Sequence, residues 1–113
     1  MHELALAESV LHIVETTAKR ESLISVQEVV LEIGELAAVE PEALQFCFGS
    51  VVLGTVAEGA QLRIVTKAGE GRCSDCNRTI WLKDRHLLCP QCGGAHIHIT
   101  GGDRMRVLEI AGK

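Results

Sequence analysis

Four cysteines in two matched pairs constrain the fold of this chain more than any other feature of its sequence. The pairs read CSDC at 73–76 and CPQC at 89–92, with residues 77–88 between them. Two residues between thiolates let one tight turn direct both sulfurs at the same ion, and two such turns complete a tetrahedron around Zn²⁺. The sequence therefore predicts a closed structural zinc site with the ligands Cys73, Cys76, Cys89 and Cys92.

Other interpretations of the cysteines are open but less favoured. A redox Cys-x-x-Cys motif usually occurs once, at the start of a helix that follows a strand, and not as a matched pair. His86, His96 and His98 lie near the pairs and could replace a thiolate, but four cysteines suffice, so we expect surface or strand histidines. The fifth cysteine, Cys47, is expected to be a small buried hydrophobic residue.

A metal would help to stabilise a chain of this size and composition. The 113 residues allow one modest core and a small additional module. Hydrophobic residues make up 47% of the chain but aromatic residues only 3%. The core must therefore be built mostly from Leu, Val, Ile and Ala, and small domains of this kind often contain a metal.

Charge and hydropathy argue against several classes of protein. The formal net charge of −4 disfavours broad nonspecific binding to nucleic acid or to an anionic membrane. The first twenty residues include Glu3, Glu8 and Glu15 and lack the pattern of a secretory signal. No apolar run approaches the roughly 18–20 residues that span a bilayer. We expect a cytoplasmic protein, in which thiols stay reduced.

Hydrophobic periodicity predicts two helices. Apolar side chains at helical spacing run from residue 4 to residue 19 and would form one buried stripe. The stripe consists of Leu4, Ala7, Leu11, Val14 and Ala18. A second helix is predicted within 39–55, because Pro41 suits a first helical turn. Its apolar side chains at helical spacing are Leu44, Cys47 and Val51.

Alternating apolar residues predict strands over 25–34, 60–68, 96–100 and 104–110. The last strand is expected to return to the sheet of the first part of the chain. The glycine-rich stretch 68–71 is interpreted as the exit from the second strand, outside any element.

The segment between the cysteine pairs is long enough for a short hairpin, with Asp84 and Arg85 near its bend and Trp81 packed inside it. The predicted fold class is α+β, with two helices packed on a three-stranded mixed sheet and an inserted zinc-ribbon-like module. Residues 1–70 and 97–113 would form the α/β domain, and residues 71–96 the zinc-binding module.

The first three residues, Met-His-Glu, form a second candidate metal site. Met1 is expected to be retained, because His2 is not small, and its α-amine would join the His2 amide and Nδ1 in fused chelate rings. Glu3 could supply a fourth ligand through its amide or its carboxylate. Nitrogen-rich, square-planar coordination suits Ni²⁺ and Cu²⁺. The alternative is that Glu3 only complements the dipole of the first helix.

Several stretches together resemble the HypA/HybF family of hydrogenase nickel-incorporation proteins. They are MHELALAESVL, VVLEIGELAAVEPEALQFCF, GTVAEGAQL and the paired Cys-x-x-Cys module, in that order. The resemblance implies that Met1, His2 and Glu3 bind nickel and that the four cysteines bind zinc. It also implies a nickel metallochaperone, not an enzyme, that works with a HypB-type GTPase and delivers Ni²⁺ to the NiFe hydrogenase large-subunit precursor.

A zinc-ribbon module that binds nucleic acid or another protein is the alternative function. Four basic residues near the cysteines give it a local basic patch, although most such patches are merely solvated. They are Arg72, Arg78, Lys83 and Arg85. With the metallochaperone preferred, neither nucleic acid nor a membrane is an expected partner.

Overall fold

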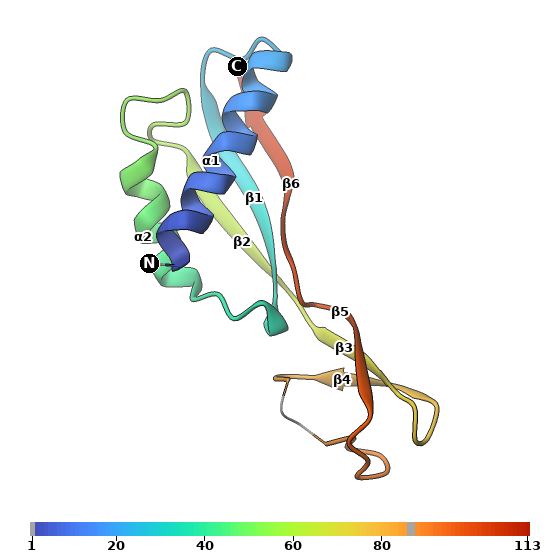
Figure 1. Ribbon diagram of the computed structural model, residues 1–113. Helices are drawn as coiled ribbons and strands as arrows, with labels where there is room; N and C mark the ends of the chain where they lie inside the picture. The colour runs from blue at the N-terminus through green and yellow to red at the C-terminus, as the bar shows by residue number, and fades with distance from the viewer. Residues whose placement is uncertain (1, 86–87) are drawn as a thin grey trace. The chain divides into compact units, whose positions relative to one another are not determined.

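The computed structural model describes residues 2–85 and 88–113 of the chain (Figure 1). Within them the strands form two three-stranded sheets, in the orders β2-β1-β6 and β4-β3-β5. The elements are α1 (His2–Arg20), β1 (Val26–Gly34), η1 (Glu35–Ala37), α2 (Pro41–Val51), β2 (Gln61–Lys67), β3 (Gly69–Cys73), β4 (Arg78–Leu82), β5 (Ile97–Gly101) and β6 (Met105–Gly112).

The chain divides into two compact units, whose boundaries fall within β1 and β2 and at the start of β6. Unit 1 consists of Met1–Leu31, Val39–Val65 and Arg106–Lys113, and unit 2 of Glu32–Ala38 and Thr66–Met105. No helix in the described ranges is long and apolar enough to cross a membrane.

Unit 1 contains both helices and most of the first sheet. The predicted α+β class, with two helices and a three-stranded mixed sheet, is confirmed, and β6 returns beside β1 as expected. The largest fully buried side chains of this unit are aliphatic apart from Phe48. This composition agrees with a core that has few aromatic residues to draw on.

Helix α1 begins with an acidic first turn and ends with Lys19 and Arg20, which complements the helix dipole. Its buried side chains are Ala7, Val10, Val14 and Ala18. The predicted stripe holds at Ala7, Val14 and Ala18, but Leu4 and Leu11 are only half-buried, and Val10 is buried in addition. Val10 and Leu11 flank the centre of the stripe, so periodicity alone does not choose between them.

Helix α2 has Pro41 in its first turn, as predicted, and buries Leu44 and Phe48. Cys47, expected to be a small buried hydrophobic residue, is only half-buried. After the helix, Gly54 adopts a positive φ of 76°. Its N–H donates to Glu58 Oε1 at 2.7 Å.

Unit 2 is built around the second sheet. The glycine-rich segment 68–71 was expected to lie outside any element, but Gly69–Cys73 forms β3, which pairs antiparallel with β4. Part of the hairpin predicted between the cysteine pairs falls on residues 86–87, which lie outside the described residues. A Cβ on Gly69 would lie 2.3 Å from the Leu82 carbonyl oxygen. Glycine is therefore required here for close strand packing, although a glycine-rich stretch looks like a linker.

Alternation along β4 decides which side chains enter the core of unit 2. Ile80 and Leu82 are buried, whereas Trp81 between them is 68% exposed, so its predicted packing inside a hairpin was wrong. The core of this unit consists of Leu36, Cys73, Ile80, Leu82 and Cys89. Two of the predicted zinc ligands are thus core residues.

Candidate metal centres

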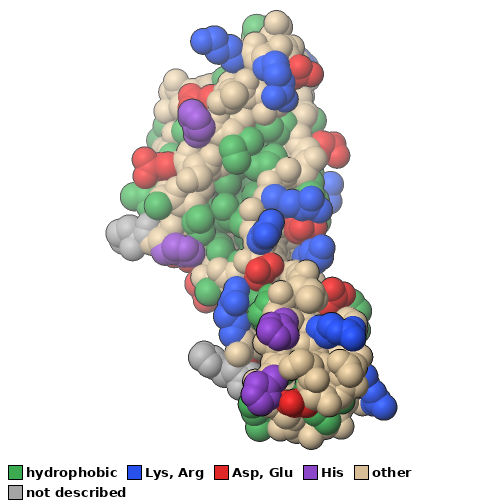
Figure 2. Space-filling model, turned by 45° about the vertical axis from the view of Figure 1, so that its right-hand side comes forward, with side chains coloured by type: hydrophobic (Ala, Val, Ile, Leu, Met, Phe, Trp, Pro, Cys, Tyr) green, Lys and Arg blue, Asp and Glu red, His purple; other side chains and the backbone are tan. Residues whose placement is uncertain are grey.

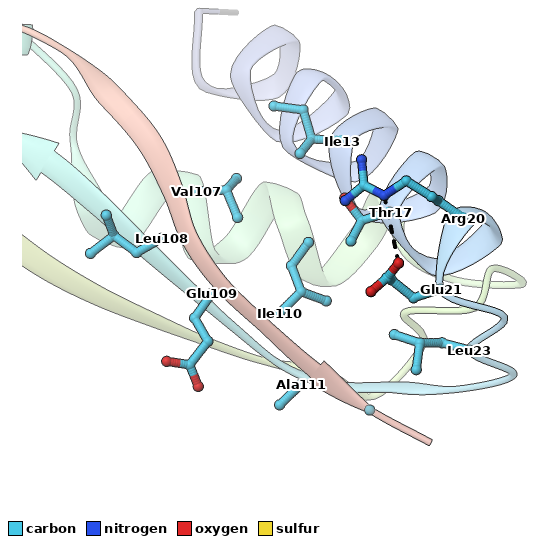
Figure 3. A pocket seen from close by; sticks show the side chains of 11 residues that line it. Ile13, Thr17, Arg20, Glu21, Leu23, Val107, Leu108, Glu109, Ile110 and Ala111 are labelled. Atoms are coloured by element: carbon cyan, nitrogen blue, oxygen red, sulfur yellow. Dashed lines mark ion pairs between the residues drawn. The ribbon is translucent and has the colours of Figure 1, made fainter.

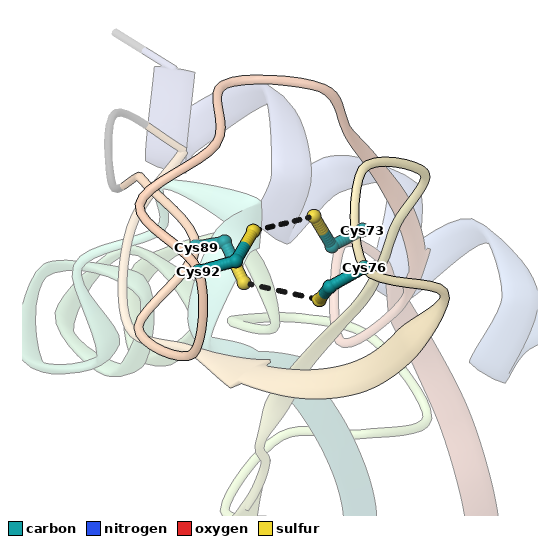
Figure 4. Close-up of side chains that lie close together, drawn as sticks. All are labelled: Cys73, Cys76, Cys89 and Cys92. Carbon is teal, nitrogen blue, oxygen red and sulfur yellow. Dashed lines mark hydrogen bonds between the residues drawn. The ribbon is translucent and has the colours of Figure 1, made fainter.

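The four predicted zinc ligands lie together in unit 2, with all their Sγ atoms within 4.8 Å of one another (Figure 4). The Sγ atoms of Cys73 and Cys92 are 3.6 Å apart, and those of Cys76 and Cys89 are 3.8 Å apart. A tetrahedron with metal–sulfur bonds of about 2.3 Å places its sulfurs about 3.8 Å apart. These separations are too long for disulfides and fit one tetrahedral thiolate-bound ion such as Zn²⁺.

Local backbone geometry aims each pair of sulfurs. Cys73 ends β3, and the turn that carries Cys76 closes through Asn77, which has a φ of 58°. In the second turn the Gly93 N–H donates to the Cys89 carbonyl at 2.8 Å, and Gly93 has a φ of 75°. Because Cys73 pairs with Arg78, the turn of the first cysteine pair is also the bend of the β3–β4 hairpin.

Backbone N–H groups also point at the sulfurs of the second pair. The Gln91 N–H donates to Cys89 Sγ and the Gly94 N–H to Cys92 Sγ, each at 3.4 Å. Such donors stabilise thiolates and hold the sulfurs in place.

The thiol pKa values diverge within the group. Burial raises the pKa of Cys76. Burial also acts on Cys89, but the N–H groups of Cys92 and Gln91 outweigh it and lower its pKa to about 7. At Cys92 the Gly94 N–H lowers the pKa, yet desolvation and the neighbouring thiols raise it to about 12. Four thiolates therefore need a bound cation to coexist, which is the chemistry of a metal site.

The nearby histidines do not join the sulfur group among the residues that the structure describes. His96 Nδ1 lies 3.0 Å from Asp75 Oδ2, and this hydrogen bond lowers the pKa of Asp75. His96 and His98 are both exposed, as expected. His86 lies outside the described residues.

The predicted nickel ligands His2 and Glu3 lie together at the start of α1. His2 Nδ1 is 3.5 Å from Glu3 Oε2, and the side chains are 59% and 21% exposed. The backbone N–H of Glu40 donates to Glu3 Oε2 at 3.3 Å and is the main cause that lowers the pKa of Glu3. Met1 lies outside the described residues.

Sequence analysis missed the role of Glu40. Its position directly before Pro41 predicts only a helix start, and nothing in the pattern connects it to a residue 37 positions earlier. The structure links the start of α1 to the backbone that precedes α2.

Two of the four basic side chains on which the alternative function depends form hydrogen bonds within unit 2. Arg78 Nη1 donates to Gln91 Oε1 at 3.1 Å, and Arg85 Nε donates to the Leu36 carbonyl at 3.3 Å. Both guanidinium groups thus bind their own unit.

Unit 1 has a hollow of about 520 Å³ between α1 and β6, lined by apolar side chains that include Ile13, Val107 and Ile110 (Figure 3). Figure 2 shows hydrophobic side chains gathered on one face of this unit. Arg20 and Glu21 form an ion pair of 3.7 Å at the edge of the hollow. Its lining includes none of the six predicted ligands that the structure describes.

Comparison with known proteins points to one family. The HypA family model, described as hydrogenase/urease nickel incorporation and metallochaperone, matches residues 1–112. The hydrogenase maturation factor HypA of Dechloromonas aromatica is 50% identical over 110 residues, or 97% of each chain. The factor of the same name from Methylocella silvestris is 46% identical over the same shares. The solution structure of the Ni metallochaperone HypA from Helicobacter pylori matches with a TM-score of 0.72 at 26% identity, over 97% of this chain and 96% of that one.

Proposed function

The chain belongs to the HypA family of hydrogenase and urease nickel-incorporation metallochaperones, and we propose that it binds Ni²⁺ at its N-terminus. We further propose that it delivers the ion to the NiFe hydrogenase large-subunit precursor with the help of a HypB-type GTPase. Nickel is the cargo of this reaction. Zinc, held by the four cysteines, would be a resident structural ion.

The observation that carries the proposal is the pairing of His2 with Glu3 in the first turn of α1. The first four N–H groups of a helix have no acceptor within the helix. Coordination of Ni²⁺ by the His2 amide nitrogen therefore breaks no hydrogen bond of α1. The α-amine of Met1, the His2 amide and imidazole, and Glu3 would supply the ligands.

Exposure supports exchange of the cargo. The His2 side chain is 59% exposed, so a partner could replace the nickel ligands one at a time. The sulfur group offers no comparable path, because Cys73 and Cys89 are buried and a tetrahedral thiolate site has no vacant position. One ion would be transferred and the other retained.

The test compares the untagged native protein with three variants. One carries an additional residue before Met1, the second is His2→Ala, and the matched control is His12→Ala, which removes an exposed histidine from the same helix. Nickel affinity is measured by calorimetry, zinc content by elemental analysis and helix content by circular dichroism.

We expect the first two variants to lose nickel binding while zinc and helix content stay unchanged, and His12→Ala to bind nickel like the native protein. Equal nickel binding by all four proteins would refute the proposal. X-ray absorption that places Ni²⁺ among sulfur ligands alone would also refute it.

A further inference from the structure

The outer face of the β4-β3-β5 sheet carries side chains that neither metal site uses. The inner face buries Ile80, Leu82 and Cys73, so the alternate residues of the same strands point away from the core. Those outward side chains include Trp81 on β4, Arg72 on β3 and His98 on β5. We refer to these three residues as the Trp81–Arg72–His98 face.

The register of the sheet brings the three side chains together. Arg72 lies opposite Thr79 of β4 and opposite His98 of β5. Trp81 lies opposite Glu70, the next outward residue of β3. Directly opposed Cβ atoms in a sheet are about 4.5–5.5 Å apart, and diagonal neighbours remain within reach of long side chains. The guanidinium can therefore be met by a ligand that also touches the indole.

None of the three side chains has a hydrogen-bond or ion-pair partner within residues 2–85 and 88–113. Trp81 is 68% exposed, and Arg72 and His98 are also exposed. Arg72 differs in this from Arg78 and Arg85, whose guanidinium groups donate to acceptors in their own unit. An indole, a guanidinium and an imidazole are thus available side by side.

The charge of the face selects the ligand. Glu70 is the one acidic residue on β3, β4 and β5, and its Oε1 accepts a hydrogen bond from Thr100 Oγ1 at 2.9 Å. That bond holds the Glu70 carboxylate beside Thr100 but does not remove its charge, whereas the Arg72 guanidinium has no acceptor among the described residues and its planar fork matches a carboxylate. Aromatic side chains dock extended proline-rich segments, and Trp and Arg are frequent anchors of protein interfaces.

We propose that the Trp81–Arg72–His98 face binds an acidic, extended segment of a partner protein. A carboxylate of that segment pairs with Arg72 while a proline or apolar side chain next to it covers Trp81. Nucleic acid fits less well, because polyphosphate binding needs several clustered cations and the chain carries a net charge of −4. This site is separate from the nickel and zinc ligands and does not depend on the proposed nickel function.

The chain offers a built-in reporter for the test, because Trp81 is its only tryptophan. Zinc-loaded, full-length protein is titrated with a peptide of alternating glutamate and proline while Trp81 emission is followed. A lysine–proline peptide of equal length and a single-stranded oligothymidine serve as competing probes. We expect the acidic peptide alone to change the emission in a saturable way, with weaker binding at higher salt.

Two variants test the role of the guanidinium. Arg72→Gln is expected to weaken the acidic peptide about five- to tenfold, as loss of one exposed charge-assisted contact does. Thr79→Asp, which places a carboxylate opposite Arg72, should weaken it similarly. Arg104→Gln is the matched control, since it removes an exposed arginine of unit 2 outside the three strands, and it should bind like the native protein.

Zinc content shows whether each variant keeps its fold. If Arg72→Gln does not fold, Thr79→Asp still tests the proposal. Emission that no peptide changes would overturn the proposal, and so would equal binding of the lysine–proline peptide. Tighter binding of oligothymidine would assign the face to nucleic acid instead. Unaltered affinity in a folded Arg72→Gln or Thr79→Asp variant would also overturn it.

Discussion

Replacing Gly34 by alanine should destabilise unit 2, because the end of β1 lies against the turn between β5 and β6 at a separation that excludes any side chain. A Cβ on Gly34 would lie 2.1 Å from the Gly102 carbonyl oxygen and 2.8 Å from the Asp103 nitrogen. Both neighbours are backbone atoms, so no rotamer change relieves the overlap. The two segments must move apart by about 1 Å to restore van der Waals contact.

The hydrogen bonds across this contact set the size of the effect. The Gly34 N–H donates to the Arg104 carbonyl at 2.8 Å, and the Leu36 N–H donates to the Gly102 carbonyl at 2.7 Å. Each such bond contributes about 1 kcal/mol, and overpacking itself costs about 1–3 kcal/mol. Movement would also withdraw Leu36, which is 4% exposed in the core of unit 2. We expect a loss of about 3–5 kcal/mol, a large share of a typical stability of about 5–15 kcal/mol.

The assay is urea unfolding of the zinc-loaded protein, followed by Trp81 emission for unit 2 and by circular dichroism at the helix band for unit 1. Gly49→Ala is the matched control, because a Cβ there would meet nothing within 4 Å. Alanine within α2 should stabilise the protein by about 0.5–1 kcal/mol. If Gly34→Ala unfolds at the same urea concentration as the native protein by both probes, the steric argument is wrong.

Two further predictions follow from burial and from the thiol groups. Zinc affinity should fall as the pH is lowered through about 7, because backbone N–H donors outweigh the burial of Cys89 and lower its pKa to about 7, and protons then compete with the ion for the thiolate. Competition with a chromophoric chelator across this pH range measures the zinc affinity. An affinity that does not change with pH would contradict the prediction. Phe48→Ala should cost about 3–5 kcal/mol, since Phe48 is 2% exposed, whereas Phe46→Ala, at 78% exposed, should stay within about 1 kcal/mol. Thermal unfolding of both variants separates the two cases, and equal losses would refute the assignment of the buried face of α2.

Patterns confined to one segment of the chain were predicted well. Both helices follow from apolar spacing and from Pro41. The return of β6 to the sheet of β1 was also predicted correctly, although it joins distant segments. The grouping of the four cysteines was predicted because two residues between cysteines define a turn, whatever the rest of the fold. The helices and the cysteine turns depend on neighbours within a few positions, so they can be predicted from the sequence.

The errors arose where distant segments decide the structure. Strand β3 contains two glycines, which have low strand propensity; Gly69 lets the backbone of β4 approach, and Gly71 leaves room for the side chains of Leu82 and Ile97. Missing β3 left β4 without its partner, and Trp81 was wrongly expected to be packed inside a hairpin with the residues that follow β4. The hydrogen bond between Glu40 and Glu3 was missed for the same reason, because it joins the starts of two helices that are far apart in sequence.

The two proposed metal sites differ in what the protein would lose with the ion. Cys73 and Cys89 belong to the core of unit 2, so release of zinc would leave two thiols inside that core without the ion that holds them together. At the N-terminus, Glu3 uses Oε2 to accept from Glu40, and the N–H groups of the first helical turn have no acceptor within α1. Nickel could therefore bind and leave without breaking a hydrogen bond that holds unit 1 together. This asymmetry is what a carrier requires, since the protein must remain folded both before and after it transfers its cargo.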